Sequence, residues 1–358
     1  MNIPQIKSNF RPLDDILYQG YAPTVISTAM ELGLFEALAK EPMNANTLSA
    51  KLGTIENITE AFANVLVSLK LLEKNGDYYS LAQVAEEFLV KASPAYQGAT
   101  IAMFSHYGQV MSKMPEILKN GPPKFDTDMW ANIEAMKVGG QGTRGGSIQD
   151  VTEFITTLPE FSNLKNMCDL GGSHGFYTMA LLDKNPQLRG TILDLPKVAE
   201  LAKELILEMG YAERIDTIGA DLKTDVSIGE GYDLVFASHV IYEWKGHLDD
   251  ILKRINKAMV PGGVFVSNHL SMDDDECGPM SGTMVELMTR LMGYPTHHLS
   301  EDELKKALET SGFGDFTVRP AEEARQYKCL ILAARKLGRP EDRDIARKQK
   351  GGKSNEQK

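Results

Sequence analysis

The chain has 358 residues, of which 42% are hydrophobic and 24% are charged, and its formal net charge is −11. This length accommodates about two domains that each bury a core, and the acidic surface disfavours nucleic acid as a partner. The three cysteines form neither a disulfide framework nor a CxxC metal motif, a usage typical of a reducing compartment. Without a signal peptide or an apolar stretch of about 20 residues, we expect a cytoplasmic protein with no membrane partner.

Residues from about 14 to 95 are predicted to be mainly helical, because apolar residues such as Val25, Ala29 and Leu32 recur at helical spacing. Two further short helices are predicted in NANTLSAKLG and ITEAFANVLVSLKLLEKNG, and Tyr78 with Tyr79 predicts a short strand before another helix. Helix, turn, helix and a small β-wing form a winged-helix pattern, which binds DNA in some proteins. The helix that would enter a DNA groove is poor in Arg and Lys, so we expect a helical module used for dimerisation.

Residues 100–165 are predicted to be connecting helices with two interruptions. One is NGPPKF. The other is the glycine-rich VGGQGTRGGS, which is interpreted as a flexible connector, with a loop over a site as the alternative.

From about residue 165, short apolar runs alternate with helical stretches: NMCDL, RGTILDLP, RIDTIGADL, YDLVFASHVIY and GGVFVSNHL. This alternation predicts βαβ units and a mostly parallel sheet covered by helices. The late runs FTVRPA and YKCLILAARK predict a closing hairpin that adds antiparallel strands. The polar, charged tail LGRPEDRDIARKQKGGKSNEQK is predicted to be disordered.

The stretch MCDLGGSHGF, residues 167–176, is predicted to end the first strand of this sheet in a glycine-rich turn. Its glycines let the backbone approach a ligand closely, and the helix that follows points its N-terminus at the same place. The next strand ends at Asp194 and the third at Asp221. Since ligands of open α/β sheets bind at the carboxyl ends of the strands, we expect these acids to face one ligand.

The spacing of the turn indicates which nucleotide this is. A dinucleotide favours G-x-G-x-x-G, whereas here Ser173 stands where the second glycine of that pattern would be. Asp169, just before the turn, suits a cationic ligand better than a pyrophosphate. S-adenosylmethionine, with its ribose, ammonium and sulfonium, matches carboxylates at successive strand ends.

The combination DLGGSHGFYTMALL, ILDLPKV, GADL, YEW and PGG resembles the class I S-adenosylmethionine-dependent methyltransferases, specifically the small-molecule O-methyltransferases of the plant and acetylserotonin type. The resemblance covers nearly the whole chain except the tail. It implies an α/β fold: a Rossmann-like, mostly parallel sheet with an antiparallel last strand, preceded by an all-helical, winged-helix-like dimerisation domain. The implied divisions are residues 1–105 for dimerisation, 106–164 lining the acceptor pocket, 165–337 binding the cofactor, and 338–358 as tail.

The resemblance also implies which residues contact S-adenosylmethionine. The acid matching Asp194 binds the ribose and the acid matching Asp221 lies near the adenine. The full implied set is Asp169, Gly171, Gly172, Gly175, Asp194, Leu195, Asp221, Leu222 and Ser238. Two alternatives remain open: Asp194 as the N-cap of a helix opened by Pro196, and Asp221 as a solvated turn acid.

The chain departs from the family where the catalytic base should be. The family carries His-Asp-Trp after the fourth strand, whereas this chain has Tyr242-Glu243-Trp244. Its acid near the fifth strand's end is matched by His269, and a further acid roughly by His297 or His298. Either the base has moved to one of these histidines, or the acceptor needs little help, as a thiol would, or the acceptor atom is carbon.

We therefore predict a homodimeric methyltransferase that uses S-adenosylmethionine and a small-molecule acceptor, with a hydroxyl as the first choice of acceptor. Tyr242, His269 and His298 are the candidate catalytic residues, and no metal site is expected. S- or C-methylation is the alternative reaction. A winged-helix regulator that senses a ligand is the alternative class of protein.

Overall fold

The computed structural model describes residues 3, 5–124, 131–224, 227–272 and 277–338. The chain forms two compact units, Met1–Lys113 and Met114–Lys358. The segment 106–164 is divided between them, and its role in lining an acceptor pocket stays a prediction. The tail predicted to be disordered lies outside the described residues except for its first two residues.

The first unit has the helices and the small wing that the sequence predicts. Its elements are α1 (Arg11–Gln19), α2 (Ala22–Glu31), α3 (Leu34–Leu38), β1 (Met43–Asn44), α4 (Ala45–Leu52), α5 (Glu56–Ser68), β2 (Leu72–Asn75), β3 (Tyr78–Leu81), α6 (Gln83–Leu89) and α7 (Gly98–Ser112). The strands form an antiparallel sheet in the order β1-β3-β2. Asn44 caps α4 by accepting a hydrogen bond from the Thr47 N–H at 2.9 Å.

The wing alternates as a half-buried strand must. Tyr79 is 1% exposed and packs in the core of this unit with Phe35, Leu48 and Leu66, whereas Tyr78 is 54% exposed. The Tyr79 hydroxyl donates to Asn64 Oδ1 at 2.9 Å, so its polar end is satisfied as well. The wing therefore closes the helical core of this unit.

The second unit is an α/β fold, as predicted. Its elements are α8 (Met114–Asn120), α9 (Ile133–Thr143), α10 (Ser147–Thr156), η2 (Phe161–Asn163), β4 (Asn166–Leu170), α11 (Phe176–Lys184), β5 (Arg189–Asp194), α12 (Pro196–Glu208), β6 (Ile215–Gly219), β7 (Tyr232–Ser238), η3 (Ile241–Trp244), α13 (Leu248–Ala258), β8 (Met259–Leu270), α14 (Met280–Leu291), α15 (Glu301–Thr310), β9 (Phe313–Arg319), η4 (Ala321–Glu323) and β10 (Cys329–Lys336).

The seven strands of this unit run in the order β6-β5-β4-β7-β8-β10-β9. The first five are parallel, and β10 pairs antiparallel with both β8 and β9, which confirms the predicted closing hairpin. The chain order reverses between β4 and β7, and the crevice at such a point is where open α/β sheets bind ligands.

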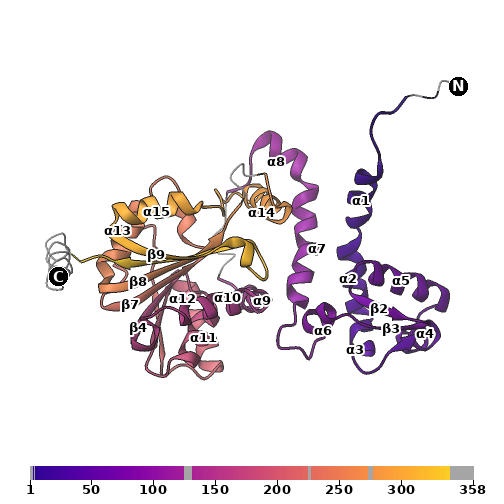
Figure 1. Cartoon of the computed structure of the whole chain (residues 1–358), viewed down its shortest axis with the longest axis horizontal. Helices are drawn as coiled ribbons and strands as arrows, with labels where there is room; N and C mark the ends of the chain where they lie inside the picture. The colour runs from indigo at the N-terminus through magenta and orange to yellow at the C-terminus, as the bar shows by residue number, and fades with distance from the viewer. Residues whose placement is uncertain (1–2, 4, 125–130, 225–226, 273–276, 339–358) are drawn as a thin grey trace, which may run out of the picture. The chain divides into compact units, whose positions relative to one another are not determined.

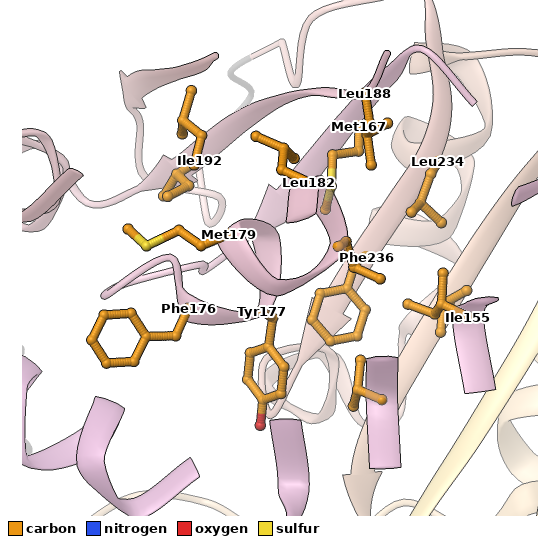
Figure 2. Packing of buried hydrophobic residues seen from close by; sticks show 14 of the residues in the cluster. Ile155, Met167, Phe176, Tyr177, Met179, Leu182, Leu188, Ile192, Leu234 and Phe236 are labelled. Carbon is orange, nitrogen blue, oxygen red and sulfur yellow. The ribbon is translucent and has the colours of Figure 1, made fainter. Parts of the chain in front are cut away.

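Helices cover both faces of the sheet: α9 to α12 lie on one face, and α13 with α15 on the other (Figure 1). The strands alternate accordingly, since Val264 and Val266 of β8 belong to one core and Phe265 to the other. Figure 2 shows the first core, in which the ring of Tyr177 on α11 packs edge-on against Phe236 of β7 at 5.3 Å. Burying such a ring contributes about 1.5–3 kcal/mol and fixes the start of α11.

The glycine-rich stretch 138–147 is not the flexible connector that was predicted. Its first part belongs to α9, which ends at Thr143, and its last residue, Ser147, begins α10. A Cβ on Gly140 would lie 2.5 Å from the ring of Phe176, so the glycine allows α9 to approach the start of α11 closely.

Within the described part of the chain, every helix is too short or too polar to cross a bilayer.

Candidate functional site

The glycine-rich turn follows β4 at the carboxyl edge of the sheet, as predicted. Gly171 has φ +66°, and its N–H donates to Leu193 O of the neighbouring strand at 2.7 Å. A Cβ at this position would lie 2.3 Å from Val240 Cγ2, so a side chain is excluded both by conformation and by space. Gly175, with φ +71°, then starts α11.

Asp194 holds this turn in place. Its Oδ2 accepts a hydrogen bond from the Ser173 N–H at 3.0 Å, and its Oδ1 accepts one from the Leu195 N–H at 2.7 Å. Ser173 has φ +42°, an uncommon value for a residue with a side chain, and the bond from its N–H stabilises that conformation. The N-cap of α12 is Leu195, without a side-chain cap bond, so the alternative role of Asp194 as N-cap is wrong.

Asp169 lies beneath the turn, 1% exposed, and its Oδ2 accepts a hydrogen bond from Thr178 Oγ1 at 2.7 Å. Gly172 leaves the space that its carboxyl group needs, since a Cβ there would lie 2.7 Å from Asp169 Cγ. Burial, opposed by the hydrogen bond from Thr178 and assisted by the charge of Asp194, raises the pKa of Asp169 to about 7. Burial also raises the pKa of Asp194. A cationic ligand beside these two carboxyl groups would lower both pKa values, because it would stabilise the charged forms.

The third strand end completes an edge with three acids. Asp221 follows β6, and its Oδ1 accepts a hydrogen bond from the Lys223 N–H at 2.9 Å. Leu222 is 9% exposed, and its carbonyl accepts a hydrogen bond from Arg254 Nη1 at 2.7 Å. Asp221 is thus a partly buried turn residue at the sheet edge, and both its cofactor role and its alternative role as a solvated turn acid stay predictions.

Ser238 ends β7 in a polar network that sequence reasoning missed. Its Oγ accepts a hydrogen bond from Asn268 Nδ2 at 2.9 Å, and Ser147 Oγ lies 2.7 Å from Tyr177 Oη. Asn268 is 1% exposed, and in the described part of the chain its Oδ1 has no hydrogen-bond partner. The only signal in the sequence was the alternation of the strand VFVSNHL, which sets Asn268 on the opposite face of the sheet from the flanking Ser267 and His269.

Tyr242 lies on η3, packed among aromatic rings. Its ring is 4.7 Å from that of His297 and 6.1 Å from that of Tyr294, both edge-on, while Tyr294 and His297 stack at 5.0 Å. The Tyr294 hydroxyl donates to Glu243 Oε1, and Glu243 Oε2 pairs with Lys223 Nζ at 2.9 Å. Tyr242 is 2% exposed, and burial raises its pKa well above the usual value.

The histidines predicted for the acceptor side come together at the ends of β7 and β8. His269 is fully buried, and its Nδ1 shares a hydrogen bond with Ser267 Oγ at 2.9 Å. Burial lowers its pKa to about 3, helped by the charges of His239 and His298. His298 is also buried and pairs by a parallel bridge with Leu270, the residue after His269.

His239 and His297 are placed beside this group. His239 follows β7 with φ +56°, and burial lowers its pKa to about 4. His297 Nδ1 shares a hydrogen bond with Thr289 Oγ1 at 2.5 Å. The backbone N–H of His297 donates to Glu286 Oε2 at 2.9 Å. In the described residues, no group of three or more His, Cys, Asp or Glu side chains is arranged to hold a metal ion.

Two family models match the chain. An O-methyltransferase domain matches residues 136–314, and an O-methyltransferase dimerisation domain matches residues 15–91. The first match covers half of the chain and contains the turn and every candidate residue described above.

Curated relatives and solved structures extend this similarity over most of the chain. The 3-hydroxy-5-methyl-1-naphthoate 3-O-methyltransferase of Streptomyces sahachiroi is 28% identical over 78% of this chain and 83% of its own length. The N,N-dimethyltransferase OxyT of Streptomyces rimosus is 28% identical over 83% of this chain and 88% of its own. The structure of human N-acetylserotonin methyltransferase with S-adenosylmethionine superimposes with a TM-score of 0.73 at 21% identity, covering 94% of this chain and all of that one.

Proposed function

The chain belongs to the O-methyltransferase family, and on that premise we propose how its own residues hold the methyl donor and the acceptor. It is an S-adenosylmethionine-dependent methyltransferase that acts on a hydroxyl of a small molecule. The observation that supports the proposed cofactor site best is the glycine turn fastened by Asp194, with acids at three consecutive strand ends.

The residues at this edge fit S-adenosylmethionine. Gly171 and Gly172 let the turn pack directly against Val240 and Asp169, with which a Cβ would collide. The raised pKa values of Asp169 and Asp194 indicate a site suited to positive charge. When bound there, S-adenosylmethionine supplies a methyl group on a sulfonium, a good leaving group. We propose that Asp194 binds the ribose and that Asp221 lies near the adenine.

The remaining contacts follow from position. Leu195 and Leu222 flank the two acids, Gly175 opens α11 under the turn, and Ser238 at the end of β7 faces the methionine part. Ser238 is held by Asn268, so both residues contribute to placing that end.

We place the acceptor against Tyr242, with His269 and His298 behind it. These side chains orient the hydroxyl for an in-line approach to the methyl carbon and exclude water from it. The tightly packed rings of Tyr242, Tyr294 and His297 provide a rigid wall for a flat acceptor.

The test of this function is transfer from cofactor labelled in its methyl group to a panel of phenols, enols, thiols and amines. Label on hydroxyl oxygen is the expected result. Label on sulfur, nitrogen or carbon with none on oxygen would contradict it. The alternative of S- or C-methylation remains a hypothesis that this panel decides.

We infer that the chain forms a homodimer through its first unit, which matches a dimerisation domain. Helix α1 has no buried residue, and its apolar side chains Ile16, Leu17 and Tyr18 are 63%, 56% and 72% exposed. A surface of this kind is typical of a protein interface. The same match leaves the DNA-binding regulator without support, while the cytoplasmic location stays a prediction.

The dimer is tested by light scattering after gel filtration. Leu17→Asp is expected to give monomers, because a charge would be buried at the interface, whereas Lys7→Asp, in the exposed segment before α1, keeps the dimer. A monomeric wild-type protein would contradict this proposal.

A further inference from the structure

The C-terminal end of α9 brings a positive charge to the glycine-rich turn. Gly140 leaves room for the ring of Phe176 at the start of α11 (Figure 2), since a Cβ on this glycine would lie 2.5 Å from the ring. One helical turn later, at the C-cap of α9, Arg144 places its guanidinium carbon 4.7 Å from the centre of the same ring. Because Phe176 follows Gly175 of the turn directly, this guanidinium lies next to the turn that we propose holds S-adenosylmethionine.

The guanidinium of Arg144 contacts an aromatic ring and, among the residues that the structure describes, no carboxylate lies within ion-pair distance of it. By contrast, Arg319 and Arg325 of the same unit both pair with Asp150. A guanidinium that stacks on a ring uses its flat face, so the N–H groups in its plane stay available as donors. The neighbouring His174 is neutral at pH 7, because burial, helped by the charge of Arg144, lowers its pKa to about 4. The positive charge at this side of the turn is therefore that of the arginine.

S-adenosylmethionine presents charges of both signs to the edge of the sheet. Its sulfonium and ammonium are attracted by the acids at the three strand ends, whereas its carboxylate is repelled by them. A cation beside the turn offsets that repulsion. An arginine suits this role better than other cations, because its planar fork can donate two parallel hydrogen bonds to one carboxylate.

We propose that Arg144 binds the carboxylate of the methionine part of S-adenosylmethionine, and so makes the enzyme select a methyl donor with a complete amino-acid end. The inference rests on the cofactor site proposed above and adds a specificity-determining residue to it. It also explains the glycine-rich stretch, since small residues let α9 come close enough to the turn for the side chain at its C-cap to reach the ligand. A carboxylate on the acceptor would offer the same chemistry, and changing the cofactor alone separates the two sources.

The experiment compares S-adenosylmethionine with its decarboxylated form, which keeps the adenosine, sulfonium and ammonium groups and lacks only the carboxylate. Calorimetry measures the affinity of the wild-type protein and of Arg144→Gln for both compounds. The wild type is expected to bind the complete cofactor at least about tenfold more tightly, because the other compound cannot form the charge-assisted pair. Arg144→Gln is expected to bind the two compounds with affinities that agree within about twofold. The control Arg189→Gln, at the opposite edge of the sheet where β5 begins, should keep the preference of the wild type.

The outcomes separate this inference from the proposed function. A wild type that binds both compounds equally, or an Arg144→Gln variant that keeps the preference with or without an overall loss of affinity, would overturn the inference and leave the cofactor site in place. Arg144→Met serves if the glutamine variant does not fold, because its side chain keeps an apolar contact with Phe176 without the charge. It is expected to lose the same preference, and a retained preference would overturn the inference. Binding of neither compound to the wild type would contradict the proposed function itself.

Discussion

Substituting Gly171 by alanine tests the turn that carries the cofactor assignment. Alanine at φ +66° costs about 1–2 kcal/mol, and its Cβ would lie 2.3 Å from Val240 Cγ2. Val240 is β-branched and cannot rotate away freely, so overpacking adds about 1–3 kcal/mol. The expected loss in the free energy of unfolding is therefore about 2–5 kcal/mol, with weaker binding of S-adenosylmethionine.

The matched control is Gly210→Ala at the end of α12. Gly210 has φ +82°, but nothing lies within 4 Å of the position that a Cβ would take. Only the conformational cost of about 1–2 kcal/mol applies, and the entropic effect of alanine on the unfolded chain is the same in both variants. Urea unfolding and calorimetry with S-adenosylmethionine compare the two. Equal losses of stability, or unchanged cofactor affinity in Gly171→Ala, would refute this reasoning.

Three further predictions concern the acids of the second unit. The pKa of Asp169 in the folded protein is raised to about 7, so its charged form destabilises the fold above that pH. The free energy of unfolding should therefore rise as the pH falls from about 7 to about 4. Asp169→Asn should flatten this pH dependence. Asp150→Ala should cost about 2–4 kcal/mol in urea unfolding, because a buried carboxylate that binds two arginines is lost, while the exposed Glu153→Ala should cost under about 1 kcal/mol. Asp194→Asn should weaken S-adenosylmethionine binding at least about tenfold by calorimetry, whereas Asp216→Asn on the exposed side of β6 should leave it unchanged; equal affinities would contradict the ribose assignment.

The order of elements was predictable from local patterns. Apolar runs of strand length separated by helical stretches predicted the parallel sheet, and the pair Tyr78 and Tyr79 predicted the wing, because burial of one sheet face is visible as alternation within a few residues. The common location of the three acids proposed to serve the cofactor was predictable for a related reason, since each lies at or near the carboxyl end of a strand and parallel strands end at one edge.

The glycine-rich stretch before α10 shows where local patterns fail. Five glycines within the eight residues 139–146 indicated flexibility, yet α9 continues through the first three of them, because packing against Phe176 requires a small residue at Gly140. Tertiary contact overrides the low helix propensity of glycine in this case.

The side-chain network of the site could not be predicted for a different reason. The Tyr294 hydroxyl reaches Glu243 across 51 positions of sequence, and Asn268 reaches Ser238 across 30. Such pairings depend on how η3 meets the segment after α14 and how β8 pairs with β7, and nothing in the neighbouring residues encodes them. The same holds for the bond from the Ser173 N–H to Asp194, which changes the role of that acid from a helix cap to a support of the turn.

The most direct test of the central claim is calorimetric titration of the wild-type protein with S-adenosylmethionine, with NAD titrated in parallel. We expect saturable binding of one S-adenosylmethionine per chain and no binding of NAD, because the turn lacks the spacing for a pyrophosphate and has three acids at its edge. No heat of binding with S-adenosylmethionine, or saturable binding of NAD, would contradict it.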